Sequence, residues 1–124
     1  MIYLDTHVVV WLYAGEVSRF SGKICELIEI NEMLISPIVM LELQYLKEIG
    51  RLEVDSGVIF ENLASTIALT TCTISFSKII SESLNQTWTR DPFDRVIVAN
   101  AIAHDALLIS KDEAILKNYT KAVW

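Results

Sequence analysis

Short apolar stretches alternate with segments of helical periodicity along the whole chain, and this alternation restricts the fold more than any other feature of the sequence. Strands that alternate with helices are typical of a parallel sheet covered by helices on both faces. No repeat, low-complexity stretch or long Pro/Gly/Ser linker interrupts the pattern over the 124 residues. We therefore expect an α/β fold in three layers, with a short, mostly parallel sheet between two layers of helices.

The expected elements follow from the spacing of the apolar residues. Gly15 and Gly50 each follow the end of an expected helix, a position that glycine favours. The predicted strands cover residues 2–4, 33–36, 68–74, 106–109 and, at one edge, 122–123. The predicted helices, in which apolar residues lie three and four positions apart, cover residues 8–14, 18–30, 37–49, 58–65, 76–88, 91–104 and 111–119.

Composition excludes several classes of protein. The longest unbroken apolar run covers residues 8–14, whereas a membrane-spanning helix needs about 20 residues. The N-terminus lacks the basic and apolar segments of a signal peptide, so we expect a soluble, cytoplasmic protein with no membrane contact. Two cysteines and two histidines, without ligand spacing, argue against disulfides and zinc. The formal net charge of −6 argues against binding nucleic acid through bulk electrostatics, unless metal ions first neutralise the acids.

Acidic residues gather at one predicted edge of the sheet. Asp5 follows the first strand directly, and Asp112 follows the strand at residues 106–109. Asp91 and Asp94 open a helix whose first turn should face the same edge. In open α/β sheets, ligands bind outside the carboxyl ends of the strands, near the point where the strand order reverses. We therefore expect these carboxylates to lie together where such sheets carry their chemistry.

Glu42 is the acid whose position is most informative. Residues three and four positions apart share one face of a helix, and on this basis Glu42 belongs to an apolar stripe. No Lys or Arg occurs at those spacings from it, and an unpaired carboxylate on a buried stripe is costly unless something neutralises it. Asp94 has the same problem on its own helix. The apolar neighbours of Glu42 at helical spacing are Ile38, Val39, Tyr45 and Leu46.

Helix capping is an alternative explanation for the individual aspartates. Asp91 precedes Pro92 in the manner of an N-cap, and Asp94 falls at the third helical position. The segment 110–113 reads as a second capping box, and Asp5 is placed to cap the first helix. Capping and chemistry explain any single aspartate equally well. Capping does not explain Glu42, nor the gathering of so many acids at one edge.

The electrostatics of such a gathering favour a bound metal. Two carboxylates about 4 Å apart repel each other by roughly 4 kcal/mol at an effective dielectric constant of 20. Without a counter-ion, at least one of them should hold a proton with a raised pKa. Oxygen ligands select Mg²⁺ or Mn²⁺, which activate water in phosphodiester cleavage. Two such ions would change the formal net charge from −6 to −2, so nucleic acid becomes an acceptable substrate.

Four short acidic motifs follow one another along the chain in an order that a known family shares. These motifs are Asp5-Thr6-His7, Leu41-Glu42-Leu43, Asp91-Pro92-Phe93-Asp94-Arg95 and Ser110-Lys111-Asp112. Together they resemble the PIN domain and, more narrowly, the VapC-type ribonuclease toxins of prokaryotic toxin–antitoxin pairs. The resemblance covers essentially the whole chain, and it implies a single three-layer α/β/α PIN-like nuclease domain over residues 1–124.

The resemblance also implies an activity and the residues that carry it. The expected activity is that of an endoribonuclease that cleaves RNA phosphodiesters with Mg²⁺ (or Mn²⁺ as a substitute) and metal-activated water. Asp94 rather than Asp91 takes the central role, because an apolar helix follows it as in the family, whereas a Lys at position 111 departs from many relatives. The implied catalytic and metal-binding residues are Asp5, Glu42, Asp94 and Asp112. The implied supporting residues are Thr6, Asp91 and Ser110.

Partners and rival functions complete the prediction. The resemblance implies a homodimer and a small cognate antitoxin whose C-terminal segment enters the active-site groove. Arg90, Arg95 and Lys111 are candidate phosphate contacts, with solvated helix-end charges as the alternative. Trp11 falls within an apolar run and is interpreted, like Tyr13, as a core or dimer contact rather than a base-stacking platform. A haloacid dehalogenase phosphatase would need an Asp where His7 stands. The alternative function is a PIN-like RNA- or protein-binding module without turnover.

Overall fold

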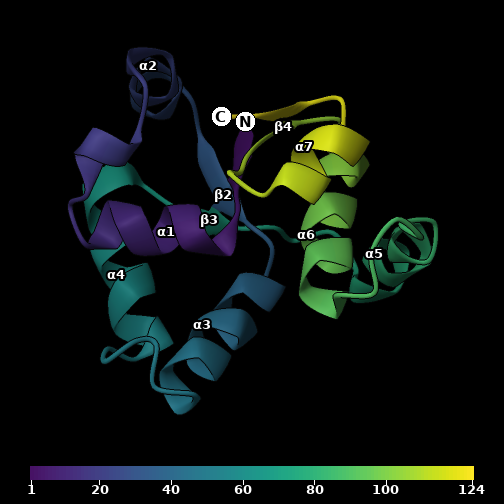
Figure 1. The fold of residues 1–124 in the computed structure, drawn as a ribbon, viewed down its shortest axis with the longest axis horizontal. Helices are drawn as coiled ribbons and strands as arrows, with labels where there is room; N and C mark the ends of the chain where they lie inside the picture. The colour runs from purple at the N-terminus through teal and green to yellow at the C-terminus, as the bar shows by residue number, and fades with distance from the viewer.

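The computed structural model describes all residues 1–124, and a five-stranded sheet lies at its centre (Figure 1). The spatial order of the strands is β3-β2-β1-β4-β5, and every neighbouring pair is parallel. The α/β class is therefore confirmed, with an all-parallel sheet where the sequence predicted a mostly parallel one. The strands are β1 (Ile2–Leu4), β2 (Met33–Ile35), β3 (Thr70–Thr71), β4 (Leu107–Ile109) and β5 (Ala122–Val123).

Helices cover both faces of this sheet. In Figure 1, α1 to α4 lie on one side of the strands and α5 to α7 on the other. This division follows from right-handed crossovers: the chain moves outward from β1 to β2 and β3, then crosses back to β4 and β5. The helices are α1 (Thr6–Tyr13), α2 (Gly22–Ile30), α3 (Ile38–Glu48), α4 (Ser56–Ile67), α5 (Phe76–Ser83), α6 (Pro92–Ala103) and α7 (Glu113–Asn118), with a 3₁₀ turn at Val17–Arg19.

The central strand β1 is buried on both faces, which explains its continuous apolar sequence. Val8 and Val9 of α1 pack on one face of the sheet, while Ile97 and Val98 of α6 pack on the other. Helix α5 lies outside α6, where Ile79 forms a smaller apolar cluster with two residues of α6. No helix has the length and apolar character needed to cross a bilayer. The two faces of the core thus fix α1 and α6 on either side of β1.

The predicted helix over residues 18–30 is wrong in one respect, because it is two elements. A 3₁₀ turn ends at Arg19, and α2 begins only at Gly22. Between them Phe20 is extended and buried, and the Ser21 hydroxyl accepts a hydrogen bond from the Ile24 amide at 3.3 Å. Serine caps of this kind compete with a continuous helix, so the apolar spacing persisted across a break.

Two other predicted elements are shorter in the structure. The helix predicted to reach residue 88 ends at Ser83, because the amides of Asn85 and Gln86 turn back to carbonyls three residues earlier. The strand predicted over residues 68–74 is reduced to the two residues of β3 at the edge of the sheet. The Cys72 amide still donates to the Ile35 carbonyl at 2.9 Å, and pairing with β2 stops there.

Candidate active site

The predicted acids line one cleft at the carboxyl ends of β1 and β4. These strands are neighbours, and the strand order reverses between them, which is where α/β sheets bind ligands. The cleft has a volume of about 380 Å³, and five of its eight lining residues are carboxylates. Its lining residues are Asp5, His7, Trp11, Glu42, Asp91, Asp94, Lys111 and Asp112. The fold therefore brings together acids from four separate parts of the sequence.

Asp5 and Ser110 form the hydrogen-bonded base of the cleft. Asp5 is only 6% exposed, and its Oδ2 accepts a hydrogen bond from the Ser110 hydroxyl at 2.6 Å. Its Oδ1 accepts from the Thr6 amide at 2.8 Å. The Ser110 Oγ in turn accepts from the Asp112 amide at 3.1 Å, so one serine positions two of the acids. Burial raises the pKa of Asp5, and the hydrogen bonds from Ser110 and Thr6 oppose that rise.

Three of the aspartates also cap helices, so the capping interpretation holds for each of them. Asp5, Asp91 and Asp112 are the N-caps of α1, α6 and α7. The Asp91 Oδ1 accepts from the amides of Phe93 at 2.8 Å and Asp94 at 3.2 Å, while the second oxygens of Asp91 and Asp112 accept no hydrogen bond from the protein. Helix N-termini favour negative charge. Capping is therefore the means by which the carboxylates are aimed at one cleft.

Glu42 and Asp94 enter the cleft from α3 and α6 without a cap or an ion pair. Burial raises the pKa of Asp94 to about 7, and repulsion from Asp91, Asp5 and the two other acids adds to this effect. Burial and the charges of Asp5 and Asp91 also raise the pKa of Glu42. No Lys or Arg makes a salt bridge with any of these acids. Their charge is left for a proton or a bound cation to neutralise.

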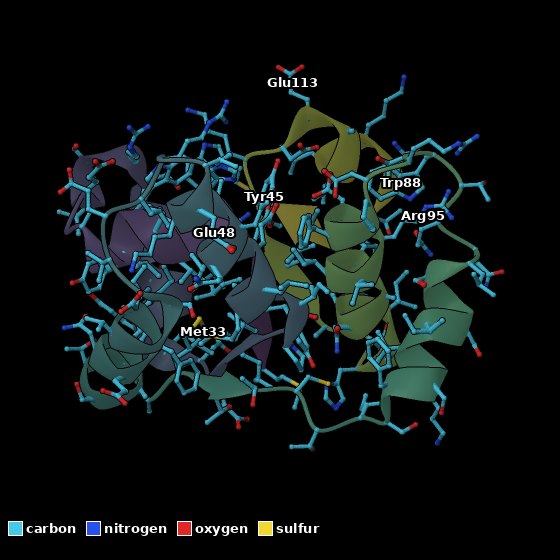
Figure 2. The ribbon with its side chains drawn as sticks, turned by 90° about the horizontal axis from the view of Figure 1, so that it is seen from below. Met33, Tyr45, Glu48, Trp88, Arg95 and Glu113 are labelled. Carbon is cyan, nitrogen blue, oxygen red and sulfur yellow. The ribbon has the colours of Figure 1, made fainter.

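The Thr6 hydroxyl lies beside Glu42 at the buried end of the cleft. It lowers the pKa of Glu42, yet its Oγ1 is buried and does not reach full hydrogen-bonding geometry with any partner. Around Glu42 the predicted apolar stripe is only partly buried, since Tyr45 is 48% exposed. Tyr45 extends from α3 toward α6 and stacks on Phe93 with ring centroids 5.9 Å apart (Figure 2). Tyr45 and Phe93 thus join α3 to the first turn of α6.

The carboxylates surround the cleft without closing on one point. No group of three or more His, Cys, Asp or Glu side chains is arranged to hold a metal ion as the side chains stand. The donors themselves are hard oxygens, and the buried Thr6 hydroxyl is available among them. Such donors suit Mg²⁺ or Mn²⁺, which retain several waters. In chemistry the lining fits a hard divalent cation, and in geometry it is open.

Comparison with known proteins identifies the family. The PIN domain profile matches residues 2–121. This chain belongs to the PIN domain family. It is similar to Ribonuclease VapC22 of Mycobacterium tuberculosis, with 30% identity over 117 residues that cover 92% of this chain and 88% of that protein. The resemblance to VapC-type PIN domains drawn from the acidic motifs is therefore confirmed.

Solved structures share the fold of this PIN domain. VapBC2 from Rickettsia felis, bound to a DNA fragment from its promoter, superposes with a TM-score of 0.68 at 21% identity, covering 100% of this chain and 98% of that one. A toxin–antitoxin complex from Klebsiella pneumoniae gives a TM-score of 0.63 at 16% identity, with coverages of 100% and 97%. These similarities confirm the three-layer α/β/α architecture.

Of the three basic residues predicted near the acids, only Lys111 lines the cleft of this PIN domain. The guanidinium of Arg90 donates to the Thr87 carbonyl at 2.9 Å, and that of Arg95 donates to the Thr89 carbonyl at 2.9 Å. Figure 2 shows Arg95 close to Trp88, on the side of α6 away from Tyr45. Both arginines support the loop that leads into α6, in keeping with their alternative interpretation as helix-end charges.

Two lining residues, His7 and Trp11, had no predicted role in the site. The sequence-based interpretation placed Trp11 in the core or at a dimer contact, whereas the structure places it in the wall of the cleft. A signal for both was present in the sequence. His7 and Trp11 are four residues apart in α1, which begins at Asp5, so they share the helix face that starts beside that carboxylate.

Proposed function

We propose that this PIN domain is a metal-dependent endoribonuclease and the toxin of a VapBC-type toxin–antitoxin pair. Its family and its similarity to a VapC ribonuclease support a nuclease. The single observation that carries the metal-dependent mechanism is the cleft, in which five carboxylates meet without a basic ion-pair partner. In this proposal the metal is held by Asp5, Glu42, Asp94 and Asp112, with support from Thr6, Asp91 and Ser110.

Mg²⁺, or Mn²⁺ in its place, would lower the pKa of a bound water and stabilise the charge that develops on the phosphodiester. The residues of the chain prepare the site for that chemistry. Two hydrogen bonds hold the Asp5 carboxylate in one orientation. Glu42 has no protein hydrogen bond at full geometry, so its carboxylate oxygens are available to orient water or accept its proton. Asp94, with a pKa near 7, loses its own proton readily when a cation arrives.

The proposed partners follow from the relatives. The structures that share this fold are described as VapBC or toxin–antitoxin complexes, and VapBC of Salmonella typhimurium is DNA-bound like that of Rickettsia felis. By analogy, we propose that a small cognate antitoxin covers the cleft of this chain and that the chain forms a homodimer. An RNA substrate and a small antitoxin place its proposed action in the cytoplasm.

The test is cleavage of a labelled single-stranded RNA by the antitoxin-free protein in Mg²⁺, in Mn²⁺ and in EDTA. We expect cleavage with either ion and none in EDTA. Asp94→Asn and Glu42→Gln should each lower the rate by about 10²–10³-fold, the usual effect of removing one preorganised electrostatic group. Asp5→Asn is a weaker choice, because it would also disturb the Ser110 hydrogen bond and the cap of α1.

Glu26→Gln is the matched control. Glu26 is an exposed carboxylate on α2, outside the cleft, so its variant should cleave like the wild type. Equal cleavage in EDTA would remove the metal from the mechanism. RNA binding by the wild type without any cleavage in either ion would favour the alternative, a binding module without turnover.

A further inference from the structure

One wall of the cleft is aromatic and basic, in contrast to the acids opposite. Trp11 forms this wall with His7, whose ring centroid is 6.1 Å away, and with Trp124, whose centroid is 5.5 Å away. Phe20 supports Trp124 from behind at a centroid distance of 5.6 Å. Trp11 is partly buried, so part of the indole packs on the core while another part borders the cleft. We call His7, Trp11 and Trp124 the aromatic wall.

Two cations lie over this aromatic wall. The Lys111 ammonium is 6.0 Å from the ring centroid of Trp11 and 5.8 Å from that of Trp124. The Arg19 guanidinium carbon lies 4.8 Å from the centroid of Trp11. Lys111 makes no salt bridge, although five carboxylates line the same cleft. Its ammonium therefore remains available to an anion that enters the cleft along the aromatic wall.

The wall and the acids match the two chemical parts of a single-stranded polynucleotide. Such strands bind where aromatic faces stack on bases and cations follow the phosphates. Trp11 is the one apolar residue that lines the cleft. An apolar peptide side chain would therefore find little surface to bury there, whereas a nucleobase needs only one π-face. These observations favour RNA over a protein segment as the occupant of the wall.

We propose that the aromatic wall is a nucleotide subsite, in which the base next to the scissile phosphate stacks on Trp11 and the adjoining phosphate contacts Lys111. The inference rests on the proposed nuclease function and adds to it the residue that positions the substrate strand. Trp11 is thus a positioning residue for RNA, and the acids on the opposite side act on the phosphodiester.

The test compares binding of two probes to the Asp94→Asn protein in Mg²⁺, measured by fluorescence anisotropy. One probe is an 8-nucleotide oligouridylate, and the other is an abasic sugar–phosphate chain of the same length, which keeps the charges but lacks the bases. We expect the oligouridylate to bind about ten-fold more tightly, as one stacked base allows. Adding Trp11→Ala should abolish this preference, and Trp11→Phe should retain most of it.

Lysine variants test the phosphate contact. Lys111→Ala should weaken both probes alike and reduce the slope of log affinity against log salt by about one. Lys117→Ala is the matched control, because Lys117 is an exposed lysine on α7 that does not line the cleft. Its salt dependence should equal that of the parent protein. An unchanged slope in Lys111→Ala would remove Lys111 from the subsite.

The subsite is overturned if Trp11→Ala prefers the oligouridylate as strongly as the parent does. It is also overturned if the variant binds both probes unchanged and loses only binding to the cognate antitoxin, which would make the wall a protein contact. Because Trp11 packs on the core, thermal melts establish that each variant is folded, and Trp11→Phe preserves most of the apolar contact. Binding is measured without turnover, so a wild type that fails to cleave RNA would refute the nuclease while leaving this result interpretable.

Discussion

Asp94 is the carboxylate whose charge the folded chain tolerates least. Burial, and then the neighbouring carboxylates, raise its pKa from 3.8 to about 7. Between these two values the carboxyl is ionised in the unfolded chain and still protonated in the folded one. The folded state therefore binds more protons in this window, and the contribution of Asp94 to stability falls as the pH rises through it.

Asp94→Asn should consequently stabilise the metal-free protein. At pH 8 in EDTA, we expect the free energy of unfolding to increase by about 1–2 kcal/mol, after allowing for solvent screening of a partly exposed group. The difference from the wild type should shrink as the pH falls toward 4, because both side chains are then uncharged. Urea unfolding curves between pH 4 and pH 8 measure it. A constant difference at all pH values, or the same gain in Glu26→Gln, would contradict this explanation.

The positions of individual acids could be predicted from the sequence more readily than the position of Trp11. Glu42 was identifiable because helical spacing alone placed its charge among apolar residues, and it does line the cleft. Trp11 lies in an apolar run, and such a run does not reveal which edge of an indole faces the core. Arg95 lies one residue from Asp94, yet it turns to the Thr89 carbonyl, since neighbours in a helix point in different directions.

The elements place these residues through the order in which strands and helices meet. Helices α1, α6 and α7 each begin at an aspartate of the cleft, because each follows a strand or loop that ends at the same edge of the sheet. The alternation of strands and helices was predictable, since its signals lie within short windows of sequence. The ends of elements were less so. Ser21 breaks a helix that the apolar spacing continues, and β3 depends on pairing with distant β2.

The end of α4 provides a test at the scale of one element. No glycine marks it, and Ala68 adopts the left-handed conformation there with φ 55°. A non-glycine residue in this conformation costs roughly 1–2 kcal/mol, part of which glycine loses again through the freedom of the unfolded chain. Ala68→Gly should therefore raise the free energy of unfolding by up to about 1 kcal/mol, as measured in urea.

Ala64→Gly is the control for this prediction, because Ala64 lies inside the same helix. There glycine should lower the free energy of unfolding by about 1 kcal/mol. Two substitutions of the same type in one helix should thus have opposite signs. Equal destabilisation by both would show that the left-handed residue at the end of α4 is not under strain.

At the scale of the whole molecule, charge connects stability to cation binding. The chain has a formal net charge of −6, and five of its acids meet in one cleft. Mn²⁺ should raise the melting temperature, because a ligand that binds only the folded state stabilises it by about 2.7 kcal/mol at 100 times its Kd. The shift should be larger at pH 8 than at pH 5.5, since protons compete for Asp94 at the lower pH.

Calorimetry with and without Mn²⁺ measures this shift, with KCl at equal ionic strength as the control for screening. Asp94→Asn should show a smaller shift than the wild type at pH 8. If the variant and the wild type gained the same number of degrees, the cation would be binding elsewhere on the acidic surface rather than in the cleft.

The hydrogen bond between Ser110 and Asp5 joins residues 105 positions apart in the sequence. A ribosome must therefore synthesise the chain beyond Asp112 before β4 can settle beside β1 and complete the cleft. A nascent or prematurely terminated polypeptide has the first carboxylate but not its partners. If the finished protein degrades RNA, its own messenger is exposed to that activity only after translation has passed nearly to the end.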